Sequence, residues 1–154
     1  MVGINWLRPE GYLRLRPMYA KTSNPGVKSN QISVEHLGLV EYKKAWEYQR
    51  EIQAGVIAGE SPNTLILLEH HSVYTAGRRT QLDERPIDGT PVIDVDRGGK
   101  ITYHGRGQLI IYPLIDLERY HLTIRSFVTL IEKSIVNFLS LRDIKASAKI
   151  EAPG

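Results

Sequence analysis

The sequence contains no cysteine in its 154 residues. A chain without a thiol forms no disulfide, offers no thiolate to a metal ion and has no cysteine nucleophile. It also lacks any apolar run near the roughly 20 residues that span a bilayer. Its longest apolar run, Leu109 to Ile115, is interrupted by Pro113 and suits a buried strand. We therefore expect a soluble protein that does not enter membranes and performs no thiol chemistry by itself.

Positive charge is concentrated at the N-terminus, although the whole sequence is basic, with a pI of 9.2. The first 30 residues hold five Lys or Arg and one acidic residue, whereas the remainder holds 15 basic and 16 acidic residues. A domain of nearly balanced charge is not expected to bind nucleic acid. Residues 1–29 are predicted to be a disordered basic leader; a transit peptide is the alternative, but the segment lacks a clear amphipathic helix. Residues 30–154 are predicted to form one domain.

Apolar periodicity predicts a series of strands and helices in this domain. The strands are expected at Ile32–Gly38, Thr64–Glu69, Val92–Asp96, Ile101–His104 and Gln108–Ile115, and the helices at Val40–Ala58 and Thr123–Asp143. The charged segment 77–90 lacks periodicity and is expected to be a loop. Gly98-Gly99 predicts a two-residue turn that joins the third and fourth of these strands as a hairpin. The order of elements predicts an α/β (or α+β) fold with a mixed sheet flanked by helices.

A last β-like stretch, Ala146–Glu151, runs into Pro153-Gly154. A strand followed directly by a Pro-Gly turn normally leads into a partner strand. The sheet is therefore expected to be incomplete on its C-terminal side.

The segment RGGKITYHGRGQ, Arg97 to Gln108, is the densest group of residues that could carry chemistry. Four glycines within eleven residues bring the backbone close to another strand or to a ligand. Arg97 and the glycine N–H groups could bind a carboxylate, a phosphate or a thioester carbonyl. Strand alternation places Thr102 and His104 on one face. The alternative is a tight hairpin with a solvated charged tip, and spacing alone leaves both interpretations open.

A second candidate is LLEHHSVYTAGRRT, Leu67 to Thr80. His70 and His71 are adjacent, but neighbours in a strand point to opposite faces and no carboxylate stands at a zinc-type spacing, so a metal site is not expected. One of these histidines is expected to face a pocket or to bond a backbone group, and Tyr74 to do likewise. Arg78 begins either a solvated turn or an anion clamp. No P-loop, GxGxxG or GxSxG motif is present.

Three ordered blocks, LLEHHSVYTAGRRT, ERPIDGTPVIDVDRGGKITYHG and GQLIIYPLIDL, resemble the octanoyltransferases that begin lipoate synthesis on proteins. The resemblance extends from about Val34 to the C-terminus. It implies the catalytic fold shared with biotin and lipoate protein ligases, in which an acyl tunnel crosses one face of a mixed sheet.

The resemblance also implies site residues and partners. It assigns substrate binding to Arg97, Gly98, Gly99, Lys100, Ile101, Thr102, Tyr103 and His104, and a supporting role in the same cavity to His70, Tyr74 and Arg78. It implies no metal and no cofactor. The implied reaction, in the cytoplasm, moves octanoyl from octanoyl acyl carrier protein to a lysine of the lipoyl domains of 2-oxoacid dehydrogenases and of the glycine cleavage H protein. The acyl group would pass through a cysteine thioester, with a lysine favouring the thiolate.

Two residues and one segment depart from the family pattern. Arg106 and His71 stand where the family has proline. The family's catalytic cysteine and lysine lie beyond the position that matches Gly154, so the chain is expected to be C-terminally truncated and inactive alone. Two alternatives remain open: a fragment of a lipoate-type ligase, which activates the acid with ATP, and a non-catalytic module that binds acyl carrier or lipoyl domains.

Overall fold

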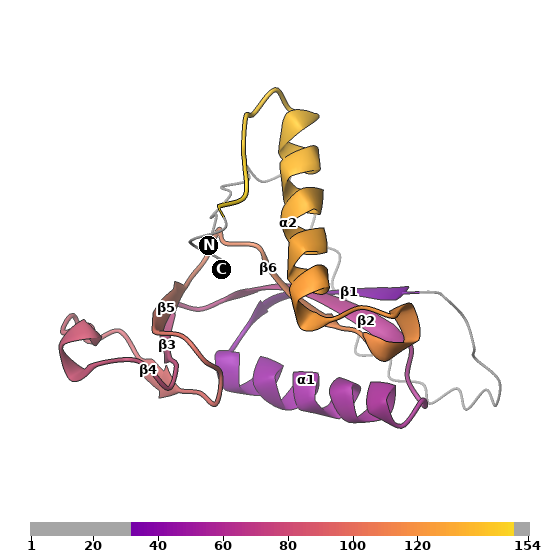
Figure 1. Ribbon diagram of the computed structural model, residues 1–154. Coiled ribbons are helices and arrows are strands. Elements are labelled where there is room, and N and C mark those ends of the chain that lie inside the picture. The colour runs from indigo at the N-terminus through magenta and orange to yellow at the C-terminus, as the bar shows by residue number, and fades with distance from the viewer. Residues whose placement is uncertain (1–31, 150–154) are drawn as a thin grey trace. The chain divides into compact units, whose positions relative to one another are not determined.

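The computed structural model describes residues 32–149. The expected leader, the last two residues of the expected Ala146–Glu151 strand and its Pro-Gly turn lie outside the described residues. The elements in chain order are β1 (Ile32–Val40), α1 (Tyr42–Ile57), β2 (Asn63–His70), β3 (Val73–Ala76), the 3-10 turn η1 (Leu82–Glu84), β4 (Val92–Asp94), β5 (Ile101–His104), β6 (Ile110–Leu114), the 3-10 turn η2 (Glu118–Tyr120) and α2 (Ile124–Ser140) (Figure 1). The chain divides into two units near residue 115, and each is described by itself.

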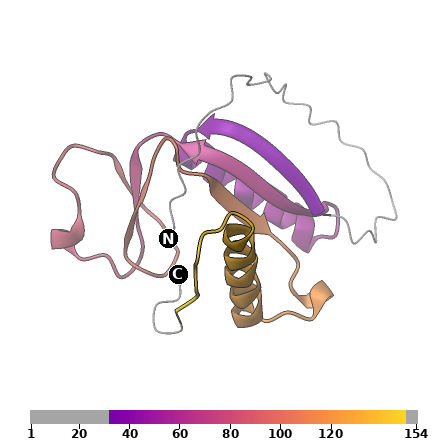
Figure 2. The ribbon, with the colours of Figure 1, turned by 90° about the horizontal axis from the view of Figure 1, so that it is seen from above.

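Sheet A contains three strands in the order β1-β2-β6. β1 and β2 are parallel and joined through α1, whereas β6 runs antiparallel to β2. In Figure 2 the three strands lie side by side with α1 along one face. Ala45 of α1 packs there on Ile66 and Leu68 of β2, and these side chains form the core of the unit. Pro113 pairs with Leu65 in β6, at the sheet edge, where a missing N–H is tolerated.

Helix α1 begins and ends close to where the sequence predicts. Glu41 is its extended N-cap, and Ala58 is its C-cap. Gly59 follows with φ +72°, a left-handed conformation that glycine adopts without steric cost. The hydrophobic period and one terminating glycine therefore account for the bounds of the helix that connects β1 to β2.

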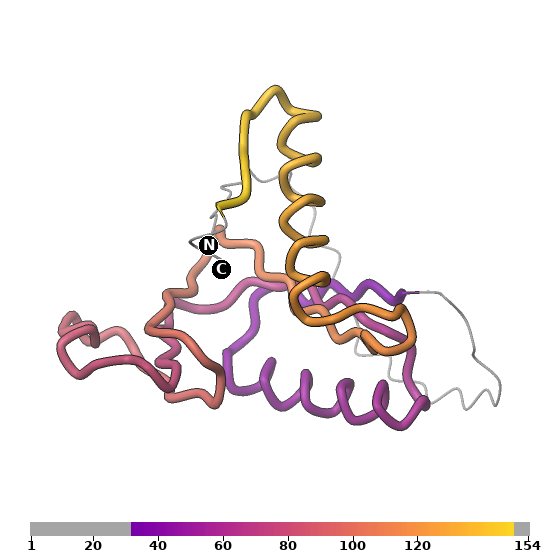
Figure 3. Tube along the Cα trace, in the orientation of Figure 1, coloured from indigo at the N-terminus to yellow at the C-terminus, as the bar shows by residue number. Residues whose placement is uncertain are grey.

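Sheet B contains the order β4-β3-β5, and this order overturns the predicted hairpin. β4 runs parallel to β3 and β5 runs antiparallel to it, so β4 and β5 flank β3 and do not pair with each other. The chain leaves β3, passes through η1 and returns as β4, a path that Figure 3 traces. A local turn signal at Gly98-Gly99 could not show that a third strand separates its two neighbours.

The loop between β4 and β5 passes so close to Gly77 that a side chain at this position would collide with it. A Cβ atom at this position would lie 2.6 Å from the carbonyl oxygen of Gly99 and 2.7 Å from that of Gly98. The backbone N–H groups of Arg78 and Arg79 donate to the carbonyls of Arg97 and Gly99, both at 3.1 Å. The segment between β4 and β5 is thus fastened across the end of β3.

The second unit carries α2, which begins at the predicted position. Thr123 caps it by accepting a hydrogen bond from the Ser126 N–H, and the Ser126 hydroxyl in turn accepts from the Thr123 N–H at 2.9 Å. The predicted strand at Ala146 is wrong over its described part, because residues 144–149 have no regular structure. β propensity alone does not make a strand where no partner strand supplies a ladder. Within residues 32–149, no helix is both long enough and apolar enough to cross a membrane.

Candidate functional site

A cluster of polar aromatic side chains lies where sheet A meets sheet B. His70 comes from the end of β2, and His104 from the end of β5; their ring centroids are 5.7 Å apart. Tyr42, the first residue of α1, contacts both rings, with centroid distances of 5.1 Å to His70 and 5.8 Å to His104. Tyr112 of β6 lies 6.0 Å from His70. We call these four residues the histidine cluster.

His70 is fully buried and both of its ring nitrogens have partners. Nδ1 lies 2.8 Å from the carbonyl oxygen of Val40, and Nε2 lies 2.9 Å from the Tyr112 hydroxyl. Because a carbonyl can only accept, Nδ1 donates to Val40, and the Tyr112 hydroxyl donates to Nε2 of the neutral ring. Burial lowers the pKa of His70 and raises that of Tyr112. The prediction that one histidine of the pair bonds a backbone group is confirmed, while His71 is exposed.

His104 has one partnered and one unpartnered ring nitrogen. Its side chain is 8% exposed, and Nε2 lies 3.3 Å from the Thr75 hydroxyl. Nδ1 is buried and has no hydrogen-bond partner. Burial first, and then the nearby His70 and Arg97, lower the pKa of His104 to about 4. The ring is therefore neutral at neutral pH and holds a buried polar atom that nothing in the described chain satisfies.

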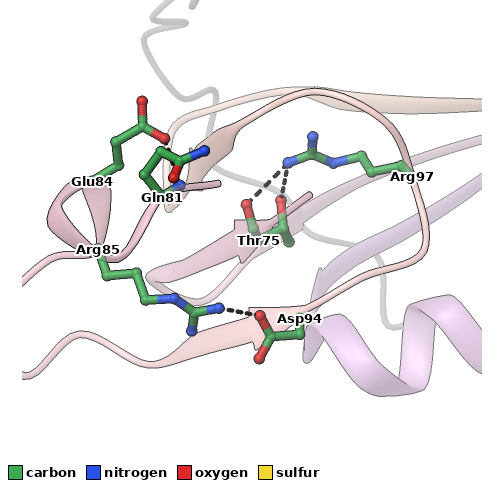
Figure 4. Close-up of polar contacts among 6 residues, drawn as sticks. All are labelled: Thr75, Gln81, Glu84, Arg85, Asp94 and Arg97. Atoms are coloured by element: carbon green, nitrogen blue, oxygen red, sulfur yellow. Dashed lines mark hydrogen bonds and ion pairs between the residues drawn. The ribbon is translucent and has the colours of Figure 1, made fainter. Parts of the chain in front are cut away.

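The Arg97 guanidinium fastens the loop that precedes β5. Nη1 donates to the carbonyls of Gly98 (2.9 Å) and Lys100 (3.0 Å). Nη2 donates to the carbonyl of Thr75 (3.0 Å) and to its hydroxyl (2.8 Å), as Figure 4 shows. These four bonds use both Nη atoms within the chain and hold the loop in place. Direct binding of an anion by Arg97 stays a prediction.

The loop held by Arg97 has two glycines, and a side chain would be strained at one of them but not at the other. Gly99 has φ +82°, and a Cβ there would lie 3.2 Å from Arg97 Nη1. Gly98 has no positive φ, and a Cβ there would meet nothing within 4 Å. The fold therefore requires glycine at position 99 and does not require it at position 98.

Ion pairs brace the outer side of this loop. Lys100 contacts Glu84, which closes a capping box on η1 with Gln81. Arg85 contacts Asp94 of β4 (Figure 4). In each pair one partner, Asp94 or Lys100, is more than half exposed, so each pair contributes little to stability. The two pairs link the segment around η1 to β4 and to the residue that precedes β5.

The remaining predicted residues lie around the cluster but are not all brought into it. Thr102 faces Thr75 across the β3–β5 ladder, and Ile101 pairs with Ala76. Tyr74 points to the other face of sheet B, where its ring lies 5.1 Å from that of Tyr103. The side chain of Arg78 is exposed. Of the three supporting residues, the structure brings only His70 into contact with His104.

A tight turn follows β5. The Gln108 N–H donates to the Gly105 carbonyl at 3.3 Å, and Gly107, with φ +82°, occupies the third position. This geometry is that of a type II turn, whose second position, here Arg106, favours proline. The Gly107 N–H donates to Glu69 Oε2 at 2.9 Å and so ties the turn to β2.

No group of three or more His, Cys, Asp or Glu side chains within residues 32–149 could hold a metal ion. The site instead combines a fixed glycine-containing loop with a buried neutral histidine. These features lie in an α/β domain with a mixed sheet and a parallel β1-α1-β2 unit. What the site offers a ligand is a hydrogen-bonding group and open backbone.

Comparison with known proteins supplies the family. A model of the lipoyl protein ligase A/B catalytic domain matches residues 41–152, and the chain belongs to this family. The octanoyltransferase of Mycobacterium tuberculosis (strain ATCC 25177 / H37Ra) is 53% identical over 109 residues, which are 71% of this chain and 46% of that protein. The octanoyltransferase of Rhodococcus jostii (strain RHA1) is 55% identical over 100 residues, or 65% of this chain and 39% of that protein. The chain thus spans less than half of the length of these relatives.

Sequence reasoning did not select three residues of the site: Thr75, Tyr42 and Tyr112. Tyr42 and Tyr112 were accounted for as ordinary members of an amphipathic helix and an apolar strand. Thr75 carried a usable signal, since it lies two residues after Val73 and so on the same face of a strand, which Gly77 ends two residues later.

Proposed function

We propose that this chain forms the acyl-binding part of an octanoyltransferase of protein lipoylation. The observation that carries the proposal is the identity of 53–55% to octanoyltransferases over 100–109 residues, within a family match that includes the Arg97 loop and His104. The site geometry supports the proposal. Four hydrogen bonds from Arg97 hold the loop, there is free space at Gly98, and the buried Nδ1 of His104 has no hydrogen-bond partner in the described chain.

The proposed donor is octanoyl acyl carrier protein, and the proposed acceptor is a lysine of a lipoyl domain, as in 2-oxoacid dehydrogenases and the glycine cleavage H protein. A cysteine thiolate would attack the thioester carbonyl carbon and release the carrier thiol. The lysine amine would then attack the enzyme thioester, form the amide and regenerate the cysteine thiol. The cytoplasm as the place of this reaction stays a prediction.

This sequence supplies binding but not the nucleophile, because it contains no cysteine. Removal of a nucleophile from an organised site costs on the order of a million-fold in kcat in serine proteases. The octanoyl chain, in contrast, offers about 5–6 kcal/mol from its seven carbons beyond the carbonyl, at ~0.8 kcal/mol per buried methylene. We therefore expect measurable acyl binding and no transfer by this chain alone.

Substitution at Gly98 tests whether the loop is a wall of the acyl site. Gly98→Ala and Gly98→Val add one and three carbons into open space at a position of ordinary φ, so the melting temperature should change little. Affinity for octanoyl-pantetheine, measured by calorimetry, should fall at least tenfold for valine and less for alanine. Unchanged affinity in both variants would show that the loop is a solvated surface turn.

An assay of transfer completes the test. The chain, octanoyl acyl carrier protein and an apo lipoyl domain should give no octanoyl-lysine above background in mass spectrometry. Addition of ATP and free octanoate should also give none, whereas ATP-dependent product would favour the ligase alternative. Transfer within a thousand-fold of a full-length octanoyltransferase would overturn the proposal that the nucleophile lies outside this sequence.

A further inference from the structure

Thr75 lies in the site, and the acyl-binding proposal does not explain why a buried hydroxyl is present at this position. It lies in the centre of sheet B, is 0% exposed, and has two polar neighbours at its hydroxyl: Arg97 Nη2 at 2.8 Å and His104 Nε2 at 3.3 Å. An apolar residue of similar shape would fill the same space in a buried strand. The hydroxyl therefore calls for a function other than packing.

The donors and acceptors around this hydroxyl can be counted. A guanidinium only donates, so Thr75 Oγ1 accepts from Arg97 and keeps one hydrogen to give. The acceptor within reach of that hydrogen is His104 Nε2. Acceptance at Nε2 requires the neutral ring to carry its proton on Nδ1.

The two tautomers of His104 differ in how many buried polar groups they leave unsatisfied. With the proton on Nδ1, the Thr75 hydroxyl both accepts and donates, and only the Nδ1–H group lacks a partner. With the proton on Nε2, both the hydroxyl hydrogen and the Nδ1 lone pair lack one. Since each unsatisfied buried group is costly, the Nδ1–H tautomer is favoured.

We propose that Thr75 is a positioning residue: its hydroxyl, bonded by Arg97, fixes His104 in the Nδ1–H tautomer and so presents a buried hydrogen-bond donor to an acceptor atom of the ligand. On the proposed function, on which this last step rests, the acceptor is the carbonyl oxygen of the acyl group. The same device sets His70, where the Val40 carbonyl holds the proton on Nδ1. The difference is that Nδ1–H of His70 is satisfied within the chain, whereas Nδ1–H of His104 is left for a ligand.

The electrostatic surroundings agree with a neutral donor. The groups that face His104 are Tyr42 from α1, His70 from β2, Thr75 from β3 and Arg97 from the loop before β5. A cation beside the ring disfavours the imidazolium form. His104 thus donates as a neutral imidazole. Arg97 also polarises the Thr75 hydroxyl, which donates to His104 Nε2.

Nitrogen-15 NMR of the histidine rings tests the tautomer without any ligand. In the unaltered chain at pH 7, His104 should show a protonated Nδ1 and an unprotonated Nε2. Thr75→Val, which replaces the hydroxyl with a methyl group, should shift His104 towards the Nε2–H form that free histidine prefers. Thr75→Ser keeps the hydroxyl and should restore the Nδ1–H signal.

Thr64→Val is the matched control. Thr64 is 2% exposed, and its hydroxyl donates to the Pro62 carbonyl at 2.9 Å, so the variant loses an equally buried hydroxyl away from His104. It should leave the His104 signals unchanged. Octanoyl-pantetheine should bind about tenfold more weakly to Thr75→Val than to Thr75→Ser.

The outcomes separate this inference from the acyl-binding proposal. An Nε2–H signal for His104 in the unaltered chain, which needs no variant to fold, would overturn the inference. Retention of the full Nδ1–H signal in folded Thr75→Val would overturn it as well. If the tautomers behave as expected but no variant binds the thioester, the proposed function fails and the role of Thr75 stands.

Discussion

At the scale of residues, the two buried histidines are held by different kinds of contact. His70 has a backbone carbonyl on one nitrogen and a tyrosine hydroxyl on the other. His104 has a threonine hydroxyl on one nitrogen and no partner on the other. A fully bonded histidine is a structural group, whereas a half-bonded one in the same cluster is available to a ligand.

The lowered pKa values of these histidines predict an acid-sensitive fold. The pKa of His104 falls from 6.5 to about 4, and that of His70 is also lowered. Between pH 6.5 and 4 the unfolded chain therefore binds more protons than the folded chain, so the free energy of unfolding falls as the pH is lowered through this range. For His104 the slope reaches up to about 1.4 kcal/mol per pH unit, and His70 acts in the same direction. Chemical denaturation at pH 7, 6 and 5 measures it.

His104→Asn isolates this contribution from that of carboxylates that titrate nearby. Asparagine stays neutral and retains an N–H donor near the position of Nδ1, so the variant should lose part of the slope between pH 6.5 and 4. Wild type and variant should converge as the pH falls. Parallel stability curves would mean that His104 titrates at its ordinary pKa in the folded chain.

At the scale of elements, the turn at 105–108 explains a departure from the family pattern. Arg106 takes the second position of a type II turn, where proline is favoured. The bond that closes this turn comes from Gln108, so proline at position 106 removes no closing bond. Arg106→Pro should raise the free energy of unfolding by about 0.4–1 kcal/mol, through restriction of the unfolded chain. Urea denaturation of the two chains measures the difference.

Proline one position later is the matched control for the turn. Gly107 has φ +82°, which proline cannot adopt, and its N–H donates to Glu69. Gly107→Pro should therefore destabilise the chain by more than Arg106→Pro stabilises it. If Arg106→Pro also destabilised, the backbone at position 106 would differ from that of a type II turn.

The same elements show which features can be predicted from sequence. α1 and α2 were predicted within a few residues because each has its own hydrophobic period, and β2 and β6 because each is a short apolar run. β3 was not assigned, because only two residues separate it from β2, so no turn signal of its own marks where it begins. The hairpin prediction failed for a different reason: two glycines signal a turn, but only the third strand decides which strands pair.

The site was predictable to a similar extent. The segment Arg97–His104 was selected as a glycine-rich group with polar side chains, and the structure places its last residue, His104, in the histidine cluster. Substrate binding by this segment stays a prediction. The hydrogen bonds from Arg97 to the chain itself were not predictable, because they go mainly to backbone carbonyls, which every residue has. The contact from Thr75 to His104 also depends on a strand register that local patterns do not give.

At the scale of the whole molecule, sheet A has two unlike faces. Ile66 and Leu68 of β2 face α1, so the alternate residues Leu65 and Leu67 face away from it. Val34 pairs with Leu65 from one side and Ile111 with Leu67 from the other. Val34 is 52% exposed and Ile111 49% exposed, so this apolar row reaches solvent on both edge strands.

An exposed apolar row that ends at two edge strands favours self-association. We expect the isolated chain to form oligomers and to bind an apolar-surface dye, as measured by size-exclusion chromatography with light scattering. Val34→Lys together with Ile111→Lys should shift the chain towards the monomer, because each lysine places a charge on an edge strand. The control pair is Ile57→Lys with Leu82→Lys, which changes side chains of 80% and 88% exposure outside this row and should leave the oligomers intact. A compact monomer with little dye binding in the unaltered chain would contradict the prediction and would strengthen the alternative of a self-contained module that binds acyl carrier or lipoyl domains.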